Sequence, residues 1–230
     1  MIKGFRGTSL VDYPGKICAV VYTYKCNFRC PYCYNLELIL PEEYHKLENI
    51  SEDWIIEELI KRKGFIKGLA ITGGEPTIWN KKLVHFIERV KFEADLSVKL
   101  DTNGSNPEIL KYLIENKIID FIAMDFKTSP EKYKLVGGDF KKIEESLEIL
   151  KSFTDNSEIR ITLYPDLVSM EDLEKMLPYL QGIKHIALQK YLSEKTYISN
   201  PPLPYSQEIY DKFYFYLKEK LPSAEIIKRY

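Results

Sequence analysis

Three cysteines lie close together near the start of the chain, at Cys26, Cys30 and Cys33, and a fourth is found at Cys18. In a reducing compartment, thiols this close in sequence are more typical of metal ligands than of disulfides. Three thiolates can hold three of the four irons of a cubane cluster, which leaves the fourth iron open to another ligand. The spacing therefore predicts an iron–sulfur cluster with one open iron.

A structural zinc site is the alternative interpretation of the triplet. Zinc in such sites takes four ligands, and its cysteines usually come as two pairs with two residues inside each pair. Cys18 is a poor fourth ligand because it falls inside an apolar run, where a cysteine packs as a small apolar side chain. The iron–sulfur cluster is therefore favoured over zinc.

Short β-rich runs, each followed by an amphipathic helical pattern, predict an α/β fold with parallel strands. The predicted strands cover residues 17–22, 68–72, 96–101, 120–125, 158–164 and 185–189. The predicted helices between them cover residues 52–63, 82–92, 107–116, 140–151 and 170–180. Six such βα units indicate a partial (β/α)6 barrel related to the TIM barrel.

The chain of 230 residues is expected to form a single domain. Residues 1–16 contain the turn-forming Asp12-Tyr13-Pro14-Gly15 and are predicted to form an N-terminal hairpin ahead of the barrel, residues 17–190. Residues 191–230 are predicted to form a C-terminal extension with an aromatic-rich helix over residues 207–220.

Polar residues recur where the predicted strands end, which is the edge that holds the active sites of barrel enzymes. The cysteine triplet follows the first strand, and the later groups are Thr72-Gly73-Gly74-Glu75, Asp101-Thr102-Asn103, and Asp125 with Lys127. Two glycines allow a backbone to approach a ligand closely, and Glu75 can neutralise an ammonium group. Buried carboxylates at Asp101 and Asp125 need a cation, a sugar hydroxyl or each other.

Charge and hydropathy exclude two classes of partner. Lysine and arginine number 33 against 34 aspartates and glutamates, so no net field favours nucleic acid or an anionic membrane. No stretch approaches the roughly 20 apolar residues of a membrane span, and the N-terminus lacks the apolar core of a signal peptide. The protein is therefore expected in the cytoplasm, without a nucleic-acid or membrane partner.

The run Cys26-Asn27-Phe28-Arg29-Cys30-Pro31-Tyr32-Cys33 and the Gly73-Gly74-Glu75-Pro76 motif resemble those of the radical S-adenosylmethionine (SAM) superfamily. The resemblance implies a [4Fe-4S] cluster on the three cysteines that reductively cleaves SAM to methionine and a 5′-deoxyadenosyl radical. It also implies that Tyr32 lies against the adenine. The residues that end the second strand, from Thr72 to Glu75, would bind the methionine part of SAM.

Asp101-Thr102-Asn103-Gly104 and Asp125-Phe126-Lys127 more narrowly resemble motifs of enzymes that activate glycyl-radical enzymes. By this resemblance, Asp101 and Asp125 bind a monovalent cation or the amine and ribose of SAM, and Lys127 meets the methionyl carboxylate. The opening run Ser9-Leu10-Val11-Asp12-Tyr13-Pro14-Gly15-Lys16 looks similar to activators of anaerobic ribonucleotide reductase. Tyr34 and Gln189 depart from those families, which have histidine at these positions.

The resemblance implies a glycyl-radical enzyme as protein substrate and a flavodoxin- or ferredoxin-like electron donor. The chain has no cysteines for an auxiliary cluster and no large second domain to close over a small molecule, which favours a protein substrate. The alternative is a small radical SAM enzyme that acts on a metabolite such as a deazapurine precursor.

Overall fold

The computed structural model describes residues 1–229. By their contacts, these residues divide into two compact units. The first unit comprises Met1–Asn27, Asn35–Thr102 and Glu108–Ile122. The second unit comprises Phe28–Tyr34, Asn103–Pro107 and the described residues from Ala123 onward. Strand β5 (Phe121–Asp125) begins in the first unit and ends in the second.

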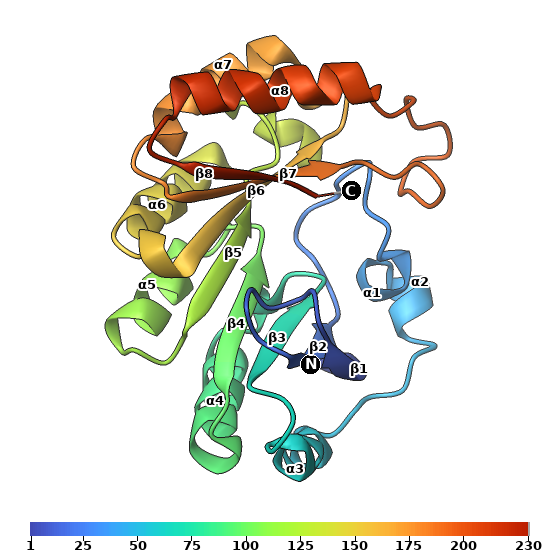
Figure 1. Ribbon diagram of the computed structural model, residues 1–230. Coiled ribbons are helices and arrows are strands. Elements are labelled where there is room, and N and C mark those ends of the chain that lie inside the picture. Colours follow the sequence, from blue (N-terminus) through green and yellow to red (C-terminus); the bar gives the residue numbers. More distant parts are fainter. Residues whose placement is uncertain (230) are drawn as a thin grey trace. The chain divides into compact units, whose positions relative to one another are not determined.

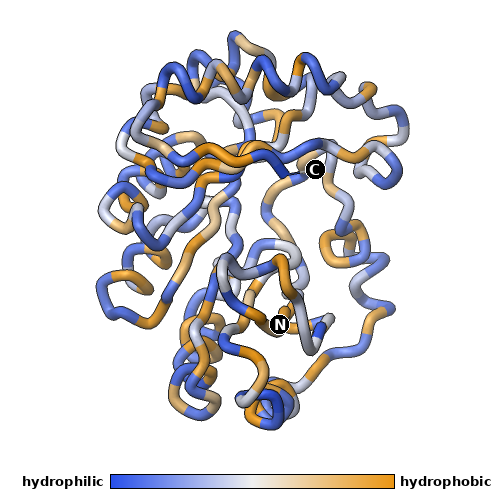
Figure 2. Tube along the Cα trace, in the orientation of Figure 1, coloured by the Kyte–Doolittle hydropathy of each residue, from blue (hydrophilic) through white to orange (hydrophobic). Residues whose placement is uncertain are grey.

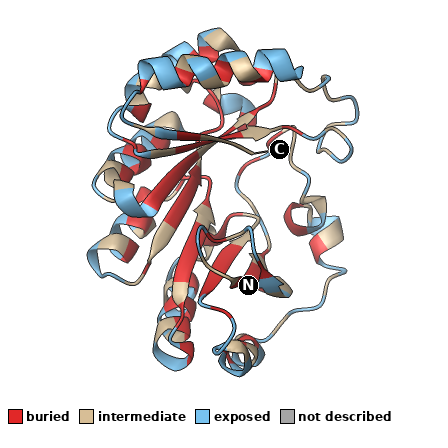
Figure 3. Ribbon diagram, viewed as in Figure 1, coloured by how far each residue is buried: buried red, intermediate tan, exposed pale blue. Residues whose placement is uncertain are grey.

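The first unit is built on four neighbouring strands, which are β1 (Ile2–Ser9), β2 (Cys18–Thr23), β3 (Gly68–Gly73) and β4 (Ser97–Thr102). The first two pair antiparallel, and the other pairs are parallel. The interiors of β3 and β4 are buried, as Figure 3 shows, and burial of this kind is usual for parallel strands. The polar residues that end these strands are therefore fixed to a rigid support.

Helices follow the strands of the first unit. They are α1 (Leu36–Ile39), α2 (Pro41–Tyr44), α3 (Glu52–Arg62), the short η1 (Pro76–Trp79), α4 (Lys81–Arg89), η2 (Val90–Ala94) and α5 (Pro107–Glu115), whose first residue belongs to the second unit. In α4 the buried residues Leu83, Phe86 and Ile87 recur at helical spacing and supply its apolar face.

The second unit contains β6 (Ser157–Leu163), β7 (His185–Lys190) and β8 (Glu225–Arg229), which pair parallel in that order. Its helices are η3 (Pro130–Val136), α6 (Phe140–Lys151), η4 (Thr154–Asn156), α7 (Met170–Leu180) and α8 (Gln207–Lys220). In β6 the apolar Ile159, Ile161 and Leu163 alternate with polar residues. Hydrophobic and hydrophilic residues both occur along α8 in Figure 2, and α8 lies alongside β8 in Figure 1.

The predicted α/β fold class is confirmed, and each of the six predicted strands is present within one residue of its expected bounds. The strand order follows the chain from β1 to β8. Two strands are additional: β1 forms its hairpin with β2, and β8 lies in the C-terminal extension beside β7. Within residues 1–229, no helix is both long enough and apolar enough to cross a membrane. The organisation as one domain stays a prediction.

Asp172 stabilises the start of α7. Its Oδ2 accepts from the backbone N of Ser169 at 2.9 Å, while the Ser169 hydroxyl accepts from the backbone N of Asp172 at 3.1 Å. Lys132 Nζ lies 2.7 Å from Oδ2, and Ser129 donates to Oδ1 at 2.7 Å. Burial acts to raise the pKa of this carboxyl, but these bonds outweigh burial and lower the pKa to about 2.

We expect Asp172→Asn to lower the free energy of unfolding at pH 7 by about 2 kcal/mol. This is the free energy that corresponds to lowering the pKa of the carboxyl from 3.8 to about 2. A depressed carboxyl pKa stabilises the fold above about pH 4, and this contribution is lost as the pH falls toward 2. The difference between the native protein and the variant should therefore narrow over that interval, as measured by urea unfolding. Asp155→Asn is the control, because Asp155 forms an exposed ion pair with Lys184. A pH-independent difference would contradict the role of the ionised Asp172.

Candidate active site

The Gly73-Gly74 pair lies against the backbone that leads from β2 to Cys26. Gly73 has a φ of +116°, and a Cβ there would overlap the backbone of Thr23. A Cβ at Gly74 would overlap the carbonyl oxygen of Lys25, and the Gly74 N donates to the Thr23 carbonyl at 2.8 Å. Glycine is therefore needed at both positions because two backbones touch. These glycines were expected to let the backbone approach a ligand closely, but in the structure they approach the backbone of Thr23 and Lys25.

Glu75 follows this pair and is buried, with 1% of its surface exposed. Its Oε1 accepts from the backbone N and the hydroxyl of Thr77, at 3.0 and 2.6 Å. The same oxygen accepts from the hydroxyl of Thr102 at 2.8 Å. Bonds to an ionised acceptor are among the stronger hydrogen bonds in proteins. The carboxylate therefore ties the end of β3 to the end of β4 within the first unit.

Asp101 lies at the end of β4 and forms an ion pair with Lys99 of the same strand. The Lys99 side chain is buried, and that of Asp101 is 13% exposed. Sequence reasoning singled out Asp101 but missed Lys99. The available signal was a lysine in the middle of the predicted strand over residues 96–101, two residues before a candidate site carboxylate.

The cysteine loop, Phe28–Tyr34, carries Cys30 and Cys33 and belongs to the second unit, whereas Cys26 belongs to the first. It is held there by backbone hydrogen bonds from Arg29 N to Val136 O at 2.9 Å and from Ile198 N to Pro31 O at 3.3 Å. A further bond, from Cys33 N to Cys30 O at 3.0 Å, closes a turn inside the loop. Two segments far along the chain therefore fix the loop.

Cys30 is buried, and burial raises the pKa of its thiol, while the ammonium of Lys127 opposes this shift. Lys127 is also buried, and its Nζ lies 5.8 Å from the centre of the Tyr32 ring. Burial acts to lower the pKa of Lys127, but Asp125, together with Cys30 and Tyr32, outweighs burial, and the pKa stands well above its ordinary value. Lys127 therefore remains a cation inside the second unit, where it can meet a carboxylate.

Asp125 ends β5 between two basic side chains of the second unit. Its Oδ1 lies 2.7 Å from Arg160 Nε, and its Oδ2 lies 3.2 Å from Lys127 Nζ. Arg160, which lies in β6, therefore forms an ion pair with Asp125. Both carboxylates predicted to bind a cation, Asp101 and Asp125, therefore have basic partners from the chain.

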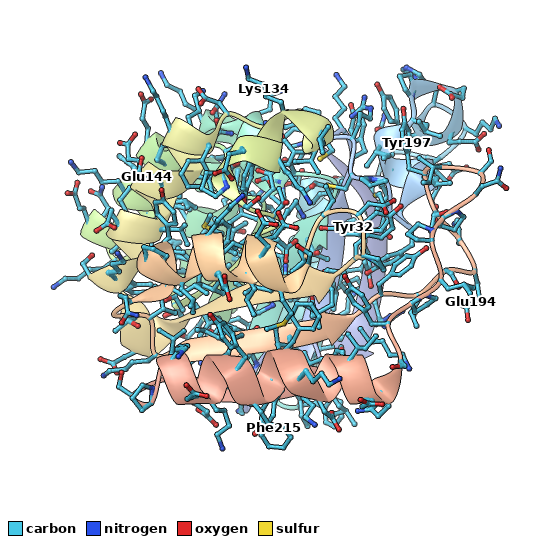
Figure 4. All side chains as sticks on the ribbon, turned by 90° about the horizontal axis from the view of Figure 1, so that it is seen from above. Tyr32, Lys134, Glu144, Glu194, Tyr197 and Phe215 are labelled. Atoms are coloured by element: carbon cyan, nitrogen blue, oxygen red, sulfur yellow. The ribbon has the colours of Figure 1, made fainter. Side chains whose placement is uncertain are left out.

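Three tyrosines of the second unit form a contiguous aromatic row. The ring centres of Tyr32 and Tyr164 are 5.4 Å apart, and those of Tyr164 and Tyr191 are 4.9 Å apart. All three hydroxyls are buried without a hydrogen-bond partner among residues 1–229. In Figure 4 the side chain of Phe215, which is exposed, points away from the rest of the protein. Tyr164 and Tyr191 were not predicted as site residues, although they directly follow β6 and β7.

Two smaller groups of predicted residues make local contacts. The carbonyl of Thr72 accepts from the hydroxyl of Thr23 at 3.2 Å in the first unit. In the second unit, the side-chain oxygen of Asn103 accepts from the backbone N of Ser105 at 2.9 Å, and both residues are buried. These bonds stabilise the loops that follow β3 and β4.

The three predicted cluster ligands are divided between the units, with Cys26 in the first and Cys30 and Cys33 in the second. Among residues 1–229, no three His, Cys, Asp or Glu side chains are grouped so that they could hold a metal ion. The shared cluster site therefore stays a prediction. The donor chemistry fits it, because none of the four cysteines forms a disulfide and thiolates are the usual ligands of iron–sulfur clusters. The buried cation at Lys127 and the unpartnered hydroxyl of Tyr32 fit a carboxylate-bearing, polar cofactor.

A comparison with protein families matches residues 20–180 to the radical SAM superfamily model. The chain belongs to the radical SAM superfamily. This radical SAM protein is therefore an enzyme that cleaves SAM, and its cofactors are a [4Fe-4S] cluster and SAM.

Relatives of this radical SAM enzyme include activating enzymes. A Methanocaldococcus jannaschii protein named for glycyl-radical enzyme activation is 33% identical over 221 residues, which cover 91% of this chain and 88% of the relative. The pyruvate formate-lyase-activating enzyme of Streptococcus mutans is 29% identical over 197 residues, which cover 81% of this chain and 74% of that enzyme.

The fold is also found in solved radical SAM structures. The structure of native anSMEcpe with bound AdoMet aligns with a TM-score of 0.64 and 19% identity over 89% of this chain. The aligned region is 62% of anSMEcpe, so this chain spans less than two thirds of that protein. At this identity, the similarity establishes the fold alone.

Proposed function

We propose that this radical SAM enzyme generates a glycyl radical on a partner protein, and that the partner is an anaerobic ribonucleotide reductase. The observation that carries the proposal is the 33% identity, along most of both chains, to the protein named for glycyl-radical enzyme activation. The opening Ser9–Lys16 run, which looks similar to ribonucleotide reductase activators, supports the narrower choice of partner.

In this proposal, Cys26, Cys30 and Cys33 hold the cluster and leave one iron open to SAM. When bound, the two cofactors together supply a one-electron reductive cleavage that yields a carbon radical able to take a hydrogen atom from glycine. The protein supplies binding, orientation and exclusion of water. A buried Cys30 and the tyrosine row that begins at Tyr32 in the same loop support the last of these roles.

The remaining site residues would orient SAM. Lys127 is a buried cation and would meet the methionyl carboxylate. The methionine amine would be bound by Glu75 and its neighbours Thr72, Gly73 and Gly74. Tyr32 would lie against the adenine. Asp101 and Asp125 would meet the amine and ribose, with Thr102 and Asn103 holding the loop after β4 in place.

The electron that this reaction consumes would come from a flavodoxin- or ferredoxin-like protein. The thiolates that hold the cluster need a reducing environment, which supports a cytoplasmic location. We infer no nucleic-acid partner, since the balanced charge offers no general attraction to phosphates.

The test is to mix the reduced, cluster-loaded enzyme with SAM and an anaerobic ribonucleotide reductase from the same organism. We expect electron paramagnetic resonance to show a doublet, because the unpaired electron couples to the one α-hydrogen left on the glycine. Replacing that partner glycine by alanine should remove the doublet and leave SAM binding to this chain unchanged.

Cleavage of SAM without a radical on any glycyl-radical enzyme of the organism would contradict the proposal. Formation of 5′-deoxyadenosine that rises only when a small molecule such as a deazapurine precursor is added would support the metabolite enzyme instead. A control lacking the reductant should give neither signal.

A further inference from the structure

Lys99 places an ammonium group inside the first unit. The residue lies in the middle of β4 and is only 4% exposed, and its Nζ forms the ion pair with Oδ1 of Asp101. Residues two apart on a strand point to the same face, so Lys99 and Asp101 lie side by side. The ammonium is the more deeply buried member of the pair, and the carboxylate lies toward the end of the strand.

The neighbouring strand provides room for this long side chain. In the parallel register, Lys99 is opposite Ala70 and Ser97 is opposite Gly68, so two small residues of β3 share the face with Lys99. A Cβ at Gly68 would crowd the ring of Tyr13, which lies 2.8 Å away. The side chain of Lys99 therefore lies beside two small residues of β3, Ala70 and Gly68.

An apolar cluster adjoins Lys99 through Ala70, the residue opposite it on β3. Cys18, Val20 and Ala70 pack with Tyr13 in one buried cluster on this sheet. Burial raises the pKa of the Cys18 thiol to about 11, so the thiol is neutral at pH 7 and supplies no negative charge. The carboxylate of Asp101 therefore acts as the counter-ion that an ammonium in such a place requires.

A buried ion pair is weak evidence for stability, because well-packed apolar residues often serve a core equally well. The position of this pair indicates another role. Asp101 ends β4 next to Thr102, whose hydroxyl binds the buried carboxylate of Glu75. The ammonium of Lys99 is thus paired with the carboxylate of Asp101, which lies at the strand end that carries the candidate site residues of the first unit.

We propose that Lys99 is a positioning residue for SAM binding: its ammonium is a fixed counter-ion that holds the carboxylate of Asp101 in place at the end of β4. The chain itself would then supply the positive charge that the family resemblance assigns to a monovalent cation. Asp125 offers a parallel in the second unit, where Arg160 and Lys127 flank its two oxygens. This inference rests on the proposed function, in which Asp101 contacts SAM.

The test measures the affinity of the anaerobically reconstituted enzyme for SAM by equilibrium dialysis. Ionic strength is held constant while choline chloride is replaced by potassium or ammonium chloride. The native protein should bind SAM equally well in all three salts, because Lys99 already provides the cation. This measurement needs no variant, and a native affinity that depends on potassium would overturn the proposal.

Two variants separate charge from volume. Lys99→Ala removes the charge and leaves a space, so SAM should bind about tenfold more weakly in choline and recover in ammonium or potassium. Lys99→Met removes the charge but keeps most of the volume, so the loss should persist in every salt. A merely structural role for Lys99 would give no rescue by small cations. The proposal would therefore be overturned if Lys99→Ala bound SAM as weakly in ammonium as in choline while its iron content and melting temperature stayed at the native values.

Lys91→Met is the matched control. Lys91 forms an ion pair of 2.6 Å with Asp120 in the same unit, and about 30% of each side chain is exposed. Its loss should leave SAM affinity unchanged in every salt.

Asp101→Asn distinguishes this inference from the proposed function. If this variant binds SAM normally, Asp101 lies outside the cofactor site and the assignment on which the inference rests is wrong. If it binds weakly while Lys99→Ala binds normally in choline, the site stands and the role of Lys99 is overturned. Radical formation on the partner tests the proposed function independently of both results.

Discussion

Alanine at Cys26, Cys30 or Cys33 will abolish both the four-iron cluster and the cleavage of SAM. Each substitution removes one of the three proposed thiolate ligands, and no other cysteine adjoins the loop to replace it. Iron and sulfide analysis, visible absorbance and the yield of 5′-deoxyadenosine after reduction measure the effect. We expect yields at background in all three variants.

Cys18→Ala is the control for this series. The Cys18 thiol is buried in the core of the first unit, and burial raises its pKa to about 11, so it packs as a neutral group. We expect full iron content and a loss of stability of about 1 kcal/mol. Loss of iron from this variant, with a full cubane in one of the other three, would show that the ligands are wrongly assigned.

Gly74→Ala should prevent the end of β3 from packing and strongly reduce cluster assembly. The added Cβ would overlap the carbonyl oxygen of Lys25, which lies next to Cys26 and belongs to the backbone rather than to a flexible side chain. We expect a loss of about 3 kcal/mol in the free energy of unfolding, the upper range for overpacking, together with reduced iron content. Urea unfolding and iron analysis measure the two effects.

Gly64→Ala is the matched control, since a Cβ at Gly64 meets no atom within 4 Å. The stability of this variant should stay within about 1 kcal/mol of the native value, because alanine mainly restricts the unfolded chain. Equal effects of the two substitutions would contradict the steric explanation.

The elements that could be predicted are those with a local signal. Buried parallel strands are typically short apolar runs in the sequence. The strand predicted over residues 68–72 is β3, Gly68–Gly73. Helix α7 covers Met170–Leu180, the range predicted for it, and α8 covers Gln207–Lys220 as the aromatic pattern indicated.

The elements that could not be predicted depend on distant partners. Strand β8 is only five residues long and becomes a strand by pairing with β7, so its own sequence is a weak signal. The ion pair of Lys99 depends on small residues of β3 that leave room for it. The role of Gly74 likewise lies in the backbone of Lys25, whose place beside β3 no local pattern encodes.

The anchoring of the cysteine loop has a consequence for how the holoenzyme is made. The loop is held by backbone hydrogen bonds to Val136 and Ile198, which the ribosome adds long after Cys30 and Cys33. At about 5–20 residues per second, the two thiols emerge many seconds before the residues that hold them. The loop therefore reaches its final conformation late in synthesis. Cluster insertion then becomes a post-translational step, during which the nascent thiols must be protected from oxygen.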